Sequence, residues 1–96
     1  MPWMPFELSK LSGRELDAAI LMTGIMAELE AVNLYVQLAA MAGSEAVREV
    51  LLDIAREEKT HIGEFLALLK TIDEELAREL ERGSEEVREL MEKLRG

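Results

Sequence analysis

The sequence predicts an all-α protein, built on an antiparallel hairpin of two long helices with a short third helix after it. Three observations favour this class. Both prolines lie within the first five residues, so the rest of the chain holds no residue that breaks a helix interior. Aromatic residues, which are frequent in strands, make up only 4% of the chain. Apolar side chains recur every three or four residues, which is the spacing of one helix face.

The composition excludes several classes of protein. The chain has 96 residues, and 20 Asp and Glu against 11 Lys and Arg give a net charge of −9. A nucleic-acid-binding protein needs a basic face, so we expect no nucleic-acid partner. The chain has no cysteine, which excludes disulfides, iron–sulfur clusters and thiol nucleophiles. Its length allows one small domain at most.

The first predicted element is an N-terminal arm over residues 1–11, which holds both prolines. A helical domain over residues 12–96 follows it. The first helix of this domain is expected over residues 13–42. Ser12 and Glu15 precede and open that helix with the spacing of a capping box.

Two further helices are predicted, each directly preceded by a glycine–serine pair. Gly43 is expected as the C′ residue of the first helix, and Ser44 as the N-cap of a second helix over residues 45–82. The pair Gly83-Ser84 repeats this signal before a short helix over residues 85–94.

No segment is expected to span a membrane. The longest apolar stretch, residues 18–27, is about ten residues long, whereas a spanning helix needs about 20. The first residues also lack the basic region of a secretory signal. We therefore expect no membrane partner and, by default, a cytoplasmic location.

The apolar stripes of the two long helices are each interrupted near the middle. On the first helix, Glu28 lies between apolar positions. On the second helix, Glu58 and His61 interrupt the stripe. Removing a carboxylate from water is costly unless a partner compensates it, so these three residues mark a candidate functional site.

The three residues are expected at the same level of the hairpin. Glu28 and Glu58 are each fifteen residues from Gly43 in the turn, which places both about 22 Å from it along antiparallel helices. His61 lies one turn beyond Glu58 on the same helix face. The hairpin thus brings two carboxylates and one imidazole to one place.

These groups match half of the ligand set of a known dinuclear metal site. Helix bundles hold two iron ions with a Glu from each of two helices and a Glu-x-x-His motif from each of two others. One chain carries one of each, so a complete site needs a homodimer. Two helices alone also bury too little apolar surface to be stable. The sequence therefore predicts that two hairpins meet face to face.

Two motifs carry a family resemblance. Residues 28–35 read Glu-Leu-Glu-Ala-Val-Asn-Leu-Tyr, and residues 57–61 read Glu-Glu-Lys-Thr-His. With these motifs the chain resembles the encapsulated ferritins of the ferritin-like superfamily. The resemblance implies a ferritin-like four-helix bundle with a di-iron ferroxidase centre at the dimer interface, where dioxygen oxidises Fe(II) to Fe(III).

The same resemblance implies partners and a location. Encapsulated ferritins assemble their dimers into larger rings, which are housed in encapsulin shells that store the oxidised iron. The chain is therefore expected in the cytoplasm, within an encapsulin nanocompartment. Its C-terminal residues 91–96 show no recognisable shell-targeting peptide.

Four residues are carried over as candidate catalytic residues. Glu28, Glu58 and His61 match the iron ligands of the family, and Tyr35 matches a tyrosine beside the site. From the residues alone, Tyr35 is more simply a packing residue or a hydrogen-bond donor to a ligand carboxylate.

Glu30 is a candidate for a secondary entry site, because it matches an acid that helps form an outer iron site in some members. Two positions depart from that pattern: Ala27 replaces an acid and Leu34 replaces a tryptophan. Glu30 also points about 160° away from Glu28 on the helix, which favours a plain surface acid.

Two alternative functions remain open. Instead of a ferroxidase, the chain could be an acidic helical dimerisation or cargo module whose metal site is structural. It could also be a rubrerythrin-like peroxidase or dimanganese catalase. The ligand set does not choose between iron, manganese and zinc.

Overall fold

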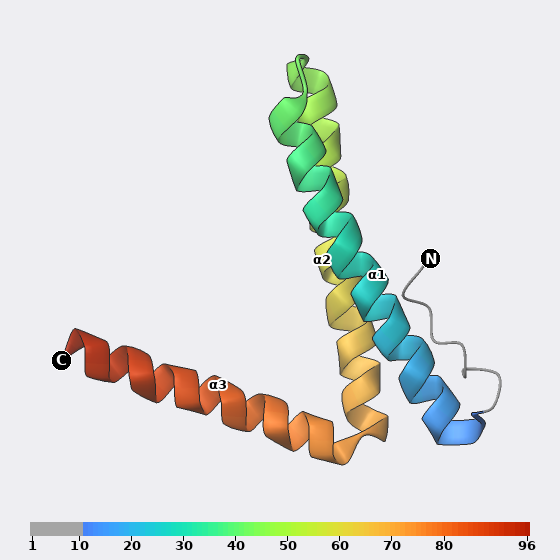
Figure 1. Ribbon diagram of the computed structural model, residues 1–96, viewed down its shortest axis with the longest axis vertical. Helices are drawn as coiled ribbons and strands as arrows, with labels where there is room; N and C mark the ends of the chain where they lie inside the picture. The colour runs from blue at the N-terminus through green and yellow to red at the C-terminus, as the bar shows by residue number, and fades with distance from the viewer. Residues whose placement is uncertain (1–10) are drawn as a thin grey trace.

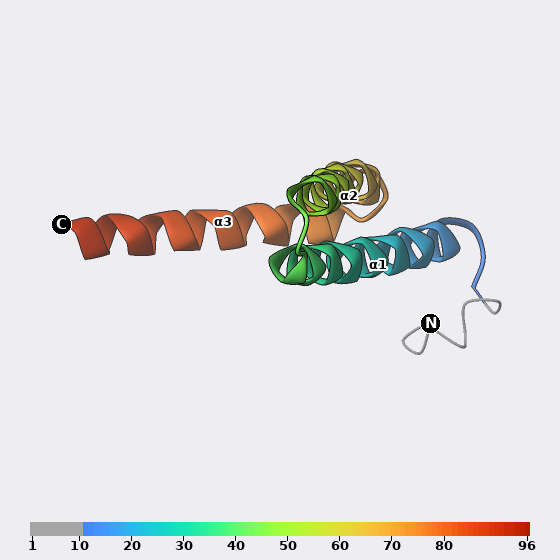
Figure 2. The same cartoon turned by 90° about the horizontal axis from the view of Figure 1, so that it is seen from above.

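A computed structural model describes residues 11–96, and every regular element within them is an α-helix. Helix α1 spans Gly13–Met41, α2 spans Glu45–Ile72 and α3 spans Glu74–Arg95. Helices α1 and α2 run antiparallel along one another (Figure 1), and the view from above shows the same pairing (Figure 2). The predicted all-α class and the two-helix hairpin are confirmed.

The turn of the hairpin is held by hydrogen bonds at the start of α2. The Ser44 hydroxyl accepts a hydrogen bond from the Val47 amide at 3.4 Å, as an N-cap does. The Arg48 guanidinium donates to the carbonyl of Ala42 at 3.2 Å. The predicted Ser44 cap is confirmed. Gly43 follows the C-cap residue Ala42 but does not adopt the left-handed conformation.

The predicted capping box at the start of α1 is wrong. Ser12 occupies the N-cap position in extended backbone, but its side chain makes no capping hydrogen bond. The following residue, Gly13, has φ 57, a region that glycine enters without steric cost. The positive φ of Gly13, rather than a side-chain cap, therefore marks the start of α1. Of the predicted N-terminal arm, residues 1–10 lie outside the described part of the chain.

The predicted boundary between the second and third helices is also wrong. Instead of continuing to residue 82, α2 ends at Ile72, and α3 is a 22-residue helix rather than a short one. The chain breaks at Asp73, whose amide donates to the Leu69 carbonyl at 2.9 Å. Its carboxylate accepts from the Leu76 amide at 2.9 Å. One residue thus ends α2 and caps α3, and Gly83-Ser84 lies inside α3.

Helix α3 points away from the hairpin, so that the molecule is flat and L-shaped (Figure 1), with extents of 49 × 45 × 20 Å. None of its residues is buried. Its apolar side chains lie on one face at the three- and four-residue spacing of an amphipathic helix. Those that are large and exposed are Leu80, Val87, Leu90, Met91 and Leu94.

The hairpin alone has almost no core. In the described residues only Ala39, Ala55 and Leu69 are buried among the hydrophobic side chains, each at 1–2% exposure. Large apolar side chains stay exposed along both helices, which is unusual for a protein that works as a single chain. On the hairpin these are Ile20, Met22, Met26, Leu29, Leu34, Val36, Leu38, Met41, Val47, Val50 and Leu68.

Helix α1 is more apolar than the ten-residue stretch at residues 18–27 indicates. By length and composition alone it is long and apolar enough to cross a membrane, and none of the window concerned is buried in the single chain. One such helix is weak evidence, because core helices of soluble proteins pass the same test. A carboxylate near its middle, Glu28, is costly inside a bilayer.

Candidate metal centre

The three residues that interrupt the apolar stripes come together between α1 and α2. The Nδ1 atom of His61 lies 3.2 Å from Oε2 of Glu28 and 3.6 Å from Oε2 of Glu58. Taking one ligand atom from each residue, all three atoms lie within 4.8 Å of one another. Within one helix, the i, i+3 spacing places Glu58 and His61 on the same face. The antiparallel pairing supplies Glu28 from the other helix.

Both carboxylates are largely withdrawn from water, whereas the imidazole is not. The side chains of Glu28 and Glu58 are 20% and 19% exposed, and that of His61 is 45% exposed. Two carboxylates so close together repel each other, and a bound cation would relieve that repulsion.

The donor set and its spacing fit a divalent transition-metal ion. Carboxylate oxygens and an imidazole nitrogen suit iron, manganese and zinc. With bonds of about 2.0–2.2 Å, two ligands of one ion lie up to about 4.2 Å apart. Side-chain rotations that move the ligand atoms by a few tenths of an ångström therefore suffice to bring all three atoms onto one ion.

Two further residues named from the sequence lie away from this cluster. Tyr35 is half-buried on α1, about 10 Å along the helix from Glu28, and is not one of the three clustered residues. Glu30 is exposed and lies on the far side of α1 from Glu28. The structure therefore brings together Glu28, Glu58 and His61 but neither Tyr35 nor Glu30.

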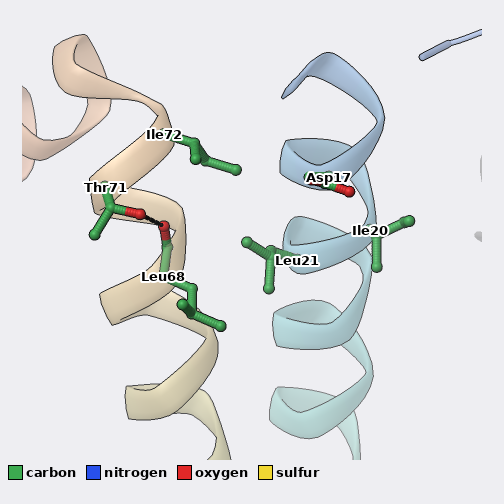
Figure 3. A pocket seen from close by; sticks show the side chains of 6 residues that line it. All are labelled: Asp17, Ile20, Leu21, Leu68, Thr71 and Ile72. Carbon is green, nitrogen blue, oxygen red and sulfur yellow. Dashed lines mark hydrogen bonds between the residues drawn. The ribbon is translucent and has the colours of Figure 1, made fainter. Parts of the chain in front are cut away.

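A shallow pocket of about 240 Å³ lies at the open end of the hairpin and contains none of the three clustered residues. Its lining is mainly apolar, and the side chains of Leu21, Leu68 and Ile72 point into the space between the helices (Figure 3). Asp17 is its one acidic residue. A single carboxylate among aliphatic side chains is a poor metal site, so the cluster and not the pocket is the candidate centre.

One contact beside the cluster has no counterpart in the sequence reasoning. Gly24 and Phe65 both belong to the apolar stripes, and the periodicity gives them no special role. In the structure the ring of Phe65 lies against the backbone of Gly24, so closely that a Cβ atom on Gly24 would meet the ring at 3.0 Å. This contact depends on the distance between the two helices, which the sequence pattern does not give.

The chain is similar to proteins of a known family. A family described as EncFtn-like matches residues 5–94. A ferritin-like-encapsulin shell fusion protein from Pyrococcus furiosus is 56% identical over 71 residues, which are 74% of this chain and 21% of that relative. The chain thus spans about a fifth of that relative's length.

A solved structure is similar as well. The crystal structure of the encapsulated ferritin domain from Pyrococcus furiosus matches with a TM-score of 0.79 and 51% sequence identity. The match covers 83% of this chain and 82% of that chain.

Proposed function

This chain belongs to the EncFtn-like family, and on that premise we propose that it is a ferroxidase, which oxidises Fe(II) to Fe(III) with dioxygen at a di-iron site shared by two copies of the chain. The family match bears out the resemblance to encapsulated ferritins that the sequence motifs predict. The support for this particular reaction comes from the residues Glu28, Glu58 and His61.

The observation that carries the proposal is the meeting of Glu28, Glu58 and His61 within 4.8 Å. Bundles that hold two iron ions use four carboxylates and two imidazoles. One chain provides half of that set, and a second copy related by a two-fold axis provides the other half. One histidine per chain is then the number that the shared site requires.

The exposed surface supports a face-to-face dimer. The His61 side chain is 45% exposed, so a second hairpin can reach the cluster and contribute its own ligands there. Burying the large apolar side chains of both hairpins in the same contact supplies the core that a single hairpin lacks. We propose that such dimers assemble further into a ring-like oligomer.

The residues present suit the oxidation of iron as substrate. Each of two Fe(II) ions loses one electron, and the two electrons reduce one dioxygen molecule to hydrogen peroxide, which takes two protons from water. The carboxylates of Glu28 and Glu58 bind Fe(III) more strongly than Fe(II), because the charge that they compensate increases. The neutral imidazole of His61 completes the coordination without adding negative charge. We assign Tyr35 a packing role beside the site and leave Glu30 as a surface acid.

The proposed setting is iron storage inside an encapsulin nanocompartment in the cytoplasm. The Pyrococcus furiosus relative is named as a fusion of a ferritin-like part with an encapsulin shell, and this chain matches 21% of it. Co-expression with an encapsulin shell protein, followed by purification of intact shells, tests the association. Co-purification in a fixed ratio is expected, and its loss from every shell preparation overturns this part of the proposal.

The activity is tested by stopped-flow absorbance after addition of Fe(II) to the air-equilibrated protein. Replacing Glu58 or His61 by Ala is expected to lower the initial rate of Fe(III) formation by about tenfold or more, as the loss of metal-site groups does. Glu57→Ala is the matched control, since this acid is the exposed neighbour of Glu58, and it is expected to oxidise iron like the wild type. Wild-type rates in both site variants contradict the assignment.

The shared site is tested by anomalous scattering at the iron edge from crystals soaked in Fe(II) without oxygen. Two peaks about 3.5–4 Å apart, related by a two-fold axis between two hairpins, are expected of a dinuclear site. A single peak within one hairpin overturns the shared di-iron site. Metal binding without any Fe(II) oxidation favours instead a structural site in a helical module.

A further inference from the structure

We propose that Gly24 and Phe65 are positioning residues, which set the distance between the ligands on α1 and α2. This inference rests on the proposed function, because it concerns the same metal centre. Gly24 lies one turn from Glu28 on α1, and Phe65 lies one turn from His61 on α2. The pair therefore lies directly beside the cluster, on its side toward the open end of the hairpin.

A side chain at position 24 would be crowded by the Phe65 ring. A Cβ atom built on Gly24 would lie 3.0, 3.2 and 3.4 Å from Cε2, Cδ2 and Cζ of Phe65. Contacts of 3.0–3.4 Å are tighter than nine in ten real Cβ contacts. The edge of the aromatic ring thus occupies the space that any other residue at position 24 would fill.

The other helix-interior glycines in the described residues differ from Gly24 in this respect. A Cβ atom on Gly63 of α2 or on Gly83 of α3 would meet no atom within 4 Å. A glycine in a helix interior destabilises it relative to alanine, and at those two sites no contact offsets the cost. At Gly24 the absent side chain admits the ring.

The distance between the helices at the Gly24–Phe65 contact and the distance between them at the cluster change together. The two levels are separated by one helical turn, about 6 Å, and both helices are continuous there. Pushing α1 away from Phe65 therefore also moves Glu28 away from His61, which now lie 3.2 Å apart. Metal ligands are held within a few tenths of an ångström of their productive positions, so a displacement of that size matters.

A Cβ atom at position 24 requires its neighbour to shift by a few tenths of an ångström. Phe65 is half-buried, and an aromatic side chain is rigid apart from two torsions. We expect the added Cβ to separate the helices rather than only to reorient the ring.

The experiment is a metal titration of the full chain with Co(II) under nitrogen, followed by the visible absorption of bound Co(II). Gly24→Ala is expected to weaken Co(II) binding by about tenfold, the lower end of what changes just outside the ligand shell cost, and to alter the absorption spectrum. Gly63→Ala is the control, because it makes the same change at an exposed site on α2, and it is expected to bind Co(II) like the wild type.

A compensating substitution separates positioning from a general loss of folding. Phe65→Leu in the Gly24→Ala background removes the ring edge that the new Cβ meets, and it is expected to restore most of the Co(II) affinity. Thermal unfolding of the metal-free proteins is measured alongside. Weakened binding without restoration in the double variant overturns the inference, and so does wild-type binding by Gly24→Ala.

The two proposals fail in different ways. A wild-type protein that binds no Co(II) at this site overturns both. A wild-type protein that binds Co(II) and oxidises Fe(II), together with a Gly24→Ala variant that is unchanged in affinity and spectrum, overturns only the positioning role of Gly24 and Phe65.

Discussion

The imidazole Nδ1 of His61 lies 3.2 Å from the carboxylate Oε2 of Glu28, although the two residues are 33 positions apart in the chain. This contact joins α2 to α1 at the level where both apolar stripes are interrupted. Glu58, on the same face of α2 as His61, adds the second carboxylate. The relationship matters because neither helix alone holds enough ligands for a metal ion.

Metal binding is expected to stabilise the fold. A ligand that binds only the folded protein contributes about 2.7 kcal/mol when its concentration is 100 times Kd, or about 10 °C or more in Tm for a chain of this size. Co(II) is therefore expected to raise Tm, and EDTA to reverse the change. The Glu58→Gln variant is expected to lose the response, whereas the exposed Glu57→Gln keeps it. An equal response in both variants would place the metal elsewhere.

Loss of the Tyr35 hydroxyl is expected to leave the first turnover of Fe(II) oxidation unchanged. The residue lies about two turns from Glu28, and packing of its ring does not require the hydroxyl. Tyr35→Phe, compared with Tyr35→Ala by stopped-flow absorbance and thermal unfolding, separates the ring from the oxygen. A large fall in the oxidation rate of Tyr35→Phe at unchanged stability would instead show that the hydroxyl acts in the reaction.

Leu69 is expected to stabilise the hairpin more than its neighbours do. It is 2% exposed and is one of three buried hydrophobic side chains in the described residues. Leu69→Ala is expected to lower the free energy of unfolding by about 2–3 kcal/mol, since it removes buried methyl groups and leaves a cavity. Lys70→Ala, at the exposed next position, should change it by about 0.5 kcal/mol or less. Urea unfolding of the metal-free chain measures both, and equal losses would refute the packing assignment.

Asp73 is expected to hold α3 through its side chain. Its carboxylate accepts a hydrogen bond from the Leu76 amide at 2.9 Å, so Asp73→Ala should cost about 1 kcal/mol, as loss of an N-cap does. Asp73→Asn retains an acceptor and should cost less. Ser44→Ala should also cost less than Asp73→Ala, because the bond from Val47 to Ser44 is longer, at 3.4 Å.

Helicity by circular dichroism and hydrogen exchange in the first turn of α3 report on this cap. Faster exchange confined to that turn in Asp73→Ala is expected. If Asp73→Ala and Asp73→Asn lose equal stability, the negative charge beside the helix N-terminus, rather than the accepted hydrogen bond, is the contribution that matters.

The sequence was sufficient to predict the hairpin and the cluster. Helix periodicity is a local property of the chain, and the turn at Gly43 and Ser44 sets the level of every residue on two antiparallel helices. Once both are known, the meeting of Glu28 with Glu58 and His61 follows from counting residues. The family motifs rest on these same positions.

The end of α2 was predicted at the wrong residue because the sequence holds two possible helix-ending signals. The pair Gly83-Ser84 resembles the true turn at Gly43-Ser44, whereas Asp73 lies in an acidic run that continues a helical pattern. The chain nevertheless breaks at Asp73, whose carboxylate accepts a hydrogen bond from the Leu76 amide in the first turn of α3. A glycine inside α3 costs only about 1 kcal/mol, which the rest of that helix tolerates.

The sequence by itself determined the helical hairpin, which residues interrupt its apolar faces and at what level those residues meet. Only the tertiary structure decided how far apart the two helices lie, and with it the close contact of Gly24 with Phe65 and the exposure of His61. The reason is physical: periodicity and register depend on the local geometry of the chain, whereas interhelical distance depends on how particular side chains fill the space between two helices.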